Sequence, residues 1–231
     1  NFIVAKNLVN SEKSKKIVLN TLKEFTPDIV HIHNLFPLWS TSILNEFIKN
    51  KIPTIMTLHN YRMFCAKGTF YKNGRICDLC HKKSTIQAVI NSCYKKSFFK
   101  TIPVANSISA NIKKNNWLKI DKFIALTDFQ KKKFVELGLP KEKIIVKPHF
   151  VNSDQNDKNY NYEKNYALYI GRLSEEKGLL TLIKAWKKIN FKLKIFGDGP
   201  LKHKLKKEIG NNKNIKLNNF ISKSEVEKEM Q

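Results

Sequence analysis

The chain alternates short apolar runs with segments of helical spacing, which is the feature that most restricts its fold. In the first part, the apolar runs are residues 28–33, 53–59, 121–127 and 143–147. Between them, residues 38–50 carry apolar side chains at helical spacing, and residues 128–138 read as a helix that stops at Gly138. Strands that alternate with helices predict a parallel sheet, and therefore the α/β class.

The alternation restarts at residue 166, after the polar and asparagine-rich stretch 152–165. Here the expected strands are residues 166–171, 191–197 and 214–220, and the expected helices are residues 179–186 and 201–209. We therefore expect an N-terminal α/β domain over 1–151, a linker over 152–165 and a C-terminal α/β domain over 166–231. The C-terminal domain is smaller than a full doubly wound domain of about 150 residues.

The formal charge of +24 arises from 43 basic and 19 acidic residues. Such a charge favours an anionic partner: a nucleic acid, an acidic membrane surface or a phosphorylated ligand. Lysine is spread along the whole chain, however, which is equally typical of a compositional bias. The only arginines are Arg62, Arg75 and Arg172, and this scarcity argues against direct reading of DNA bases.

No apolar run approaches the roughly 20 residues of a membrane-spanning helix, and the start has no signal-peptide pattern. The sequence begins without methionine and stops inside an expected helix, "SKSEVEKEMQ". We therefore expect both ends to be cut.

Gly171 and Arg172 follow the expected strand of the C-terminal domain, where open α/β sheets bind ligands. Ser174 is a plausible N-cap of the next helix, and Lys177 would lie near the start of that helix. A guanidinium fork, an ammonium group and helix amides at one place would form a diphosphate site. The alternative is an exposed loop whose charges only increase solubility.

The next strand end, "FGDGP", places Gly197 and Gly199 on either side of Asp198. Glycines at such a position permit a tight turn or a close approach to a ligand. Alone this is a common turn, but it follows "GRLSEEKG" by one helix and one strand, which strengthens the ligand-site interpretation.

Several motifs in order resemble a known family. "GRLSEEKGLLTLIKAW", "LKIFGDGPLKHKL" and "NIKLNNF" resemble the second half of the retaining GT-B glycosyltransferases of family 4, or glycosyl transferases group 1. "PDIVHIHNLFPLWS", "IPTIMTLHNYRMFC" and residues 121–151 are similar to the members that build bacterial polysaccharides. The resemblance covers nearly the whole chain.

The resemblance implies a GT-B fold, with two Rossmann-like domains facing a cleft, both truncated here. It implies that the second domain binds the nucleotide-diphosphate sugar. Arg172 and Lys177 match the basic pair that holds the diphosphate and stabilises the leaving phosphate, so that catalysis requires no metal. Gly171, Gly197, Asp198 and Gly199 complete the expected donor site.

His59, at the end of the run 53–59, matches the histidine that contacts the transferring sugar; the alternative is a strand-end histidine bonded to backbone. His31 or His33 could face the acceptor, and Thr127 could line the same cleft. His149 stands where the family pattern has asparagine, and we draw nothing from that departure.

Two parts of the family pattern are missing: a first strand with a glycine-rich loop before residue 1, and an acidic E-x7-E motif beyond residue 231. We therefore expect this chain to be inactive alone and its full-length parent to be the enzyme.

All four cysteines, Cys65, Cys77, Cys80 and Cys93, fall in or beside an expected insertion over residues 60–94. The C-x2-C pair with two flanking cysteines is compatible with a structural zinc site, with His81 as a substitute ligand. Four reduced thiols are an equal alternative. Disulfides fit a reducing cytoplasm poorly.

The resulting expectation is a cytoplasmic transferase that moves a sugar from a nucleotide-sugar donor, with retention, to a glycan or polyprenyl-linked saccharide during cell-surface polysaccharide biosynthesis. Its lysines could contact anionic lipid at the inner membrane face. We expect no nucleic acid partner. The alternatives are a basic zinc-knuckle module that binds nucleic acid, and a GT-B sugar-nucleotide epimerase or phosphorylase.

Overall fold

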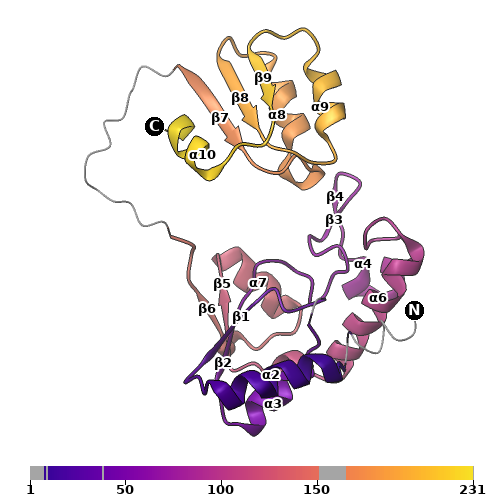
Figure 1. Ribbon diagram of the computed structural model, residues 1–231. Helices are drawn as coiled ribbons and strands as arrows, with labels where there is room; N and C mark the ends of the chain where they lie inside the picture. Colours follow the sequence, from indigo (N-terminus) through magenta and orange to yellow (C-terminus); the bar gives the residue numbers. More distant parts are fainter. Residues whose placement is uncertain (1–7, 9, 38, 151–164, 231) are drawn as a thin grey trace. The chain divides into compact units, whose positions relative to one another are not determined.

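The computed structural model describes residues 8, 10–37, 39–150 and 165–230, which fall into two compact units (Figure 1). Unit 1 is Asn1–Phe150 and unit 2 is Val151–Gln231. The expected linker, 152–165, lies almost entirely outside the described residues. Each unit has its own hydrophobic core.

Unit 1 is built on a parallel sheet in the order β1-β2-β5-β6. Its strands are β1 Val30–His33, β2 Thr54–Thr57, β5 Lys122–Ala125 and β6 Ile144–Val146. Its α-helices are α2 Glu12–Glu24, α3 Ile43–Lys49, α4 Leu79–Lys82, α5 Ile86–Ile90, α6 Phe98–Lys113 and α7 Asp128–Glu136. Short 3-10 turns, η1 Asn116–Lys119 and η2 Lys141–Lys143, precede β5 and β6.

Unit 2 has a second parallel sheet, in the order β7-β8-β9. The strands are β7 Tyr166–Ile170, β8 Lys192–Phe196 and β9 Ile215–Asn218. The helices are the 3-10 turn η3 Glu175–Lys177, α8 Leu179–Trp186, α9 Lys202–Ile209 and α10 Lys223–Met230. The expected α/β class, with parallel sheets in both parts, is confirmed.

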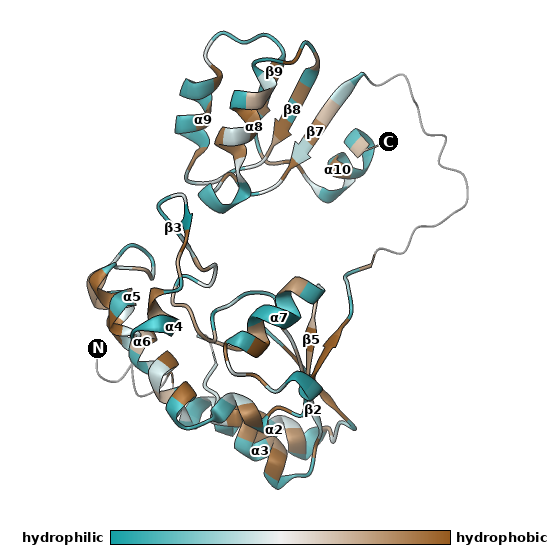
Figure 2. Ribbon diagram, turned by 180° about the vertical axis from the view of Figure 1, so that it is seen from behind, coloured by the Kyte–Doolittle hydropathy of each residue, from teal (hydrophilic) through white to brown (hydrophobic). Residues whose placement is uncertain are grey.

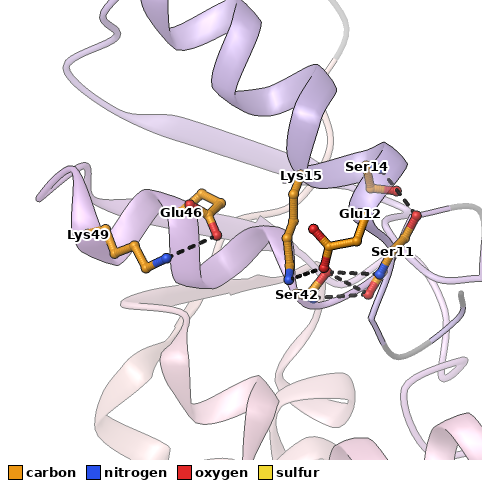
Figure 3. A network of polar contacts seen from close by, with 8 residues as sticks. Ser11, Glu12, Ser14, Lys15, Ser42, Glu46 and Lys49 are labelled. Carbon is orange, nitrogen blue, oxygen red and sulfur yellow. Dashed lines mark hydrogen bonds and ion pairs between the residues drawn. The ribbon is translucent and has the colours of Figure 1, made fainter. Parts of the chain in front are cut away.

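The helix expected over residues 38–50 is shorter, because α3 begins only at Ile43. The preceding residues, Ser40, Thr41 and Ser42, are buried. The hydroxyl of Ser40 donates to that of Ser42, and the hydroxyl of Thr41 donates to Asn111 Oδ1. Ser42 Oγ accepts a hydrogen bond of 3.3 Å from the backbone N–H of Ser11, at the start of α2 (Figure 3). These polar contacts join α2 to the start of α3.

Residues 60–94 contain regular structure as well as loops. The hairpin of β3 Tyr71–Lys72 and β4 Arg75–Ile76 is followed by α4 and α5. Cys65, Phe70 and Ala88 are buried in the core of unit 1. The insertion is therefore packed onto the domain that carries it.

The buried face of helix α6 is partly polar, so its apolar spacing alone does not define it. Thr101, Ser107 and Asn111 are fully buried on it. Asn111 accepts hydrogen bonds from Thr41 Oγ1 at 2.6 Å and from Asn116 Nδ2 at 2.8 Å. Hydrogen bonds thus replace apolar contacts over this part of the interface.

Candidate functional site

Two groups of candidate residues lie at the carboxyl ends of the strands, one in each unit. The first is a row of histidines in unit 1. His31 and His33 lie two residues apart on β1, so they share one face of the strand, while Ile32 is buried on the other. Their ring centroids are 4.2 Å apart.

His59 lies two residues beyond the end of β2, so the expectation that it ends the strand is wrong by two residues. Its Nε2 is 2.7 Å from Nδ1 of His33. Because a hydrogen bond between ring nitrogens needs one N–H and one lone pair, at least one of the two rings is neutral. The next residues repeat this pairing, since Asn60 Nδ2 donates to Asn34 Oδ1 at 2.8 Å.

His149 completes the row, and its ring stacks on His59 with a centroid separation of 5.5 Å and an interplanar angle of 19°. Burial, followed by the imidazoles of His33, His149 and His31, lowers the pKa of His59. Burial also lowers the pKa of His31, as do His33 and Lys147. The surroundings of His31 and His59 therefore favour the neutral form of these two imidazoles.

Buried Gln130 fixes the backbone just before His59. Its Nε2 donates to the carbonyl oxygen of Leu58 and its Oε1 accepts from the N–H of Leu126, both at 2.7 Å. Thr127 caps α7, because its hydroxyl oxygen accepts from the N–H of Gln130 at 3.1 Å. This cap is a structural role for Thr127 that the sequence interpretation did not assign.

The second group forms a cavity of about 530 Å³ in unit 2, at the ends of β7 and β8. Arg172 is exposed on its wall, beside Gly171, Gly197 and Asp198. The remaining lining residues are Ile170, Phe196, Phe220, Ile221, Lys223 and Val226. The structure thus brings four of the expected donor-site residues together.

Lys177 and Gly199 are not among the lining residues. Lys177 lies in the exposed turn η3. The second cation on the wall is Lys223, at the start of α10. In the described part of the chain, no carboxylate forms an ion pair with Arg172, whereas Asp198 pairs with Lys202 at 3.3 Å.

Ser174 occupies the expected N-cap position, but of the 3-10 turn η3 and not of an α-helix. Ser174 makes no capping bond to the backbone; its hydroxyl donates to Glu176 Oε1 at 2.6 Å. The α-helix starts five residues later, at Leu179 after Gly178.

The glycines of "FGDGP" let two neighbouring backbone segments approach each other closely. A Cβ on Gly197 would overlap the carbonyl oxygen of Gly171, and one on Gly199 would lie 2.5 Å from the carbonyl oxygen of Leu173. Backbone bonds join the segments, from Gly171 N–H to Phe196 O at 3.0 Å and from Leu173 N–H to Asp198 O at 2.9 Å. The glycines therefore shape the cavity by holding its two loops together.

The four cysteines have free thiols; Cys65 is buried and the others are half-buried. Burial and the thiols of Cys65, Cys93 and Cys77 raise the pKa of Cys80 to about 12. The thiols thus influence one another, but the described residues contain no group of three or more His, Cys, Asp or Glu side chains arranged to hold a metal ion. The zinc site stays a prediction.

Comparison with protein families shows where this arrangement belongs. The model of Glycosyltransferase Family 4 matches residues 13–155, and that of Glycosyl transferases group 1 matches residues 151–231. The chain belongs to glycosyltransferase family 4. Comparison with curated proteins found no match.

Among solved structures, this family 4 chain is similar to the lipopolysaccharide outer core galactosyltransferase WaaB, with 18% identity and a TM-score of 0.51 over 95% of this chain and 51% of that one. It is also similar to TarM from S. aureus, with 18% identity and a TM-score of 0.48 over 90% of this chain and 36% of that one. HepE from Anabaena, in complex with UDP, is 14% identical, with a TM-score of 0.49 over 90% of this chain and 52% of that one. The chain thus spans about half or less of these proteins. The likeness to WaaB shows the fold, GT-B.

The described part of the family 4 chain contains no helix of the length and apolarity needed to cross a membrane. Sequence interpretation missed His149, Phe220, Ile221, Lys223 and Val226. These residues reach the two sites because the chain turns back after β6 and β9, and the spacing of residues along the sequence does not predict those turns.

Proposed function

We propose that the chain is the donor-binding and acceptor-side part of a transferase that moves a sugar from a nucleotide-diphosphate sugar to a glycan or polyprenyl-linked acceptor. The observation that carries this is Arg172, exposed on a cavity of about 530 Å³ at the carboxyl edge of a parallel sheet. That volume is typical of small-molecule sites. Family membership supports the reaction class.

In this proposal the diphosphate lies against Arg172. The guanidinium fork can hold two phosphate oxygens, and Lys223 and Lys177 add positive charge nearby. The apolar side of the cavity, including Phe196, Phe220 and Ile221, takes the base. Cations that offset the charge on the leaving phosphate remove the need for a catalytic metal.

We further propose that His59 contacts the transferring sugar, that the anomeric configuration is retained, and that the reaction serves cell-surface polysaccharide biosynthesis at the cytoplasmic side of the membrane. Burial lowers the pKa of His59, which favours the neutral imidazole, and a neutral imidazole is suited to hydrogen-bond a sugar hydroxyl.

Calorimetric titration with UDP, GDP and ADP tests the donor site. We expect one of them to bind, Arg172→Ala to weaken that binding at least tenfold, and Arg172→Lys to restore part of it, because a hydrogen bond to a charged group contributes about 1.5–3 kcal/mol. Arg75→Ala is the matched control, since Arg75 lies on β4 in unit 1. EDTA should leave the affinity unchanged.

If none of the three diphosphates binds, or if Arg172→Ala binds as tightly as the parent, the proposal is wrong. Binding of oligonucleotides that falls steeply with salt would instead favour the nucleic-acid module. Conversion of a sugar nucleotide without any acceptor would favour an epimerase or phosphorylase.

A further inference from the structure

The short helix α5 presents its apolar side outward. Ala88 is 1% exposed, whereas Ile86 and Ile90 are 59% and 64% exposed. Ile86 and Ile90 are four residues apart and therefore share a face of the helix, opposite Ala88. Figure 2 shows α5 in brown at the margin of unit 1, beside α6. Because this apolar face does not pack into the core, it is a candidate site for contact with another molecule or a membrane.

The start of α6, the helix packed against α5, also exposes apolar side chains. Phe98 and Phe99 are 48% and 74% exposed, and their rings meet edge to face with centroids 5.6 Å apart. The helices α5 and α6 pack against each other. The turn between them is anchored to α6, because the N–H of Tyr94 donates to Thr101 Oγ1 at 3.0 Å. The exposed apolar side chains therefore belong to two helices whose connection is held by a hydrogen bond.

The sequence segment that contains α5 and α6 carries charge of one sign. Between Asp78 and Asp121 the sequence contains no acidic residue and eight lysines, although about one residue in twelve of the whole chain is acidic. Exposed lysines flank the apolar side chains: Lys82, Lys83, Lys95, Lys96 and Lys100. Of these, Lys82 pairs with Asp78 at 2.8 Å. A uniform lysine bias does not explain a segment that also lacks acidic residues.

We propose that this surface, formed by Ile86, Ile90, Phe98 and Phe99 with the lysines around them, docks on an anionic lipid bilayer. Phenylalanine and isoleucine side chains can enter the boundary between headgroups and acyl chains. Lysine ammonium groups then reach the lipid phosphates, while their methylene stems lie along apolar surface. Nucleic acid fits less well, because there is no arginine between Arg75 and Arg172 and the exposed isoleucines cannot stack on bases.

The docking surface is independent of the nucleotide cavity, because it lies wholly in unit 1. Lipid binding can therefore fail while nucleotide binding succeeds, and the reverse. If the proposed acceptor is a polyprenyl-linked saccharide, this surface would bring the chain to it.

Co-sedimentation with vesicles tests the proposal. We expect the chain to bind phosphatidylcholine vesicles that contain phosphatidylglycerol at least tenfold more tightly than vesicles of phosphatidylcholine alone, and to lose affinity as salt increases. The double variant Phe98→Ser, Phe99→Ser should lower the affinity at least tenfold. The double variant Lys95→Asn, Lys96→Asn should lower it roughly tenfold to thirtyfold. Asparagine suits these two positions, since both have positive φ.

Matched controls lie elsewhere in unit 1. Phe129→Ser removes another exposed ring, on α7, and Lys13→Asn with Lys16→Asn removes the same charge from α2. These variants should bind anionic vesicles like the parent. Equal loss in the lysine control would assign binding to net charge alone, and equal loss in Phe129→Ser would assign it to exposed rings in general; either result would overturn the proposal. So would a self-association, seen by light scattering, that Phe98→Ser with Phe99→Ser abolishes while vesicle binding is unchanged.

Discussion

Nδ1 of His33 lies 2.7 Å from Nε2 of His59, so the imidazole at the end of β1 and the one just beyond β2 share one hydrogen bond. The contact fixes the ring of His59, the proposed sugar-contacting residue, through its Nε2. Nδ1 is then the remaining nitrogen of His59 for a contact with the sugar. Which ring donates depends on the tautomer. Protonation of both rings would remove the acceptor and break the bond.

We expect His33→Gln to raise the pKa of His59 while leaving it below its usual range. The imidazole of His33 is the second cause of the lowered pKa, and burial, the first cause, would remain. NMR titration of the histidine rings measures the change. His203→Gln, on α9 in unit 2, should leave the titration of His59 unaltered. A lower pKa in His33→Gln would contradict the assigned electrostatics.

Unit 1 should lose stability as the pH falls through the ordinary histidine range. His31 and His59 have lowered pKa values in the folded chain, so the unfolded chain binds protons first, below about pH 6.5. Over the window between the unfolded and folded pKa values, the free energy of unfolding decreases with falling pH, and below it the effect levels off. Urea unfolding between pH 5 and 8 tests this, and a decrease that persists in the variant His31→Gln, His59→Gln would contradict it.

We expect Asn111→Ala to lower the free energy of unfolding by about 2–3 kcal/mol. The side chain bonds to Thr41, Asn116 and Ser107, and its removal leaves buried polar groups without a partner. Asn106→Ala is the matched control, because Asn106 is exposed on the same helix. It should change stability by less than about 0.7 kcal/mol, in the stabilising direction. Similar effects at the two positions would show that the buried network does not stabilise unit 1.

Gly197→Ala should destabilise unit 2 by more than about 2 kcal/mol, because the new methyl group would overlap the backbone of Gly171. Gly178→Asn is the control: its φ of 69° suits asparagine, and a Cβ there meets nothing within 4 Å. Urea unfolding followed by fluorescence measures both, since Trp186 lies in unit 2. Equal stability of the two variants would contradict the close approach of the two backbone segments at Gly197.

For the cysteines we expect about one zinc ion per chain after purification without chelators, and little in Cys77→Ser or Cys80→Ser. The spacing supports a four-thiolate site, and metal binding would offset the unfavourable ionisation of Cys80. Elemental analysis measures the metal, and Lys83→Ser is a neighbouring control that leaves the thiols intact. A reduced protein that takes up no zinc would establish the alternative, four structural thiols.

The sequence predicted the strands well, because apolar runs such as 166–171 and 191–197 are long and bounded by turn residues. It predicted that Arg172 and Gly197 belong to the same ligand site, because the carboxyl ends of parallel strands lie at the same edge of the sheet. It did not predict the stacking of His149 on His59, which lie 90 positions apart. It predicted the bounds of α8, residues 179–186, but not that the Ser174 hydroxyl bonds to the Glu176 side chain instead of to the backbone.

The two separate hydrophobic cores allow unfolding itself to report where a ligand binds. Trp186 belongs to the core of unit 2, whereas Trp117 is buried in that of unit 1. A small molecule that binds one folded unit raises the melting temperature of that unit alone. Scanning calorimetry of the unaltered chain, with and without a nucleotide, would therefore show which unit binds the nucleotide, because only the unfolding transition of that unit shifts to higher temperature.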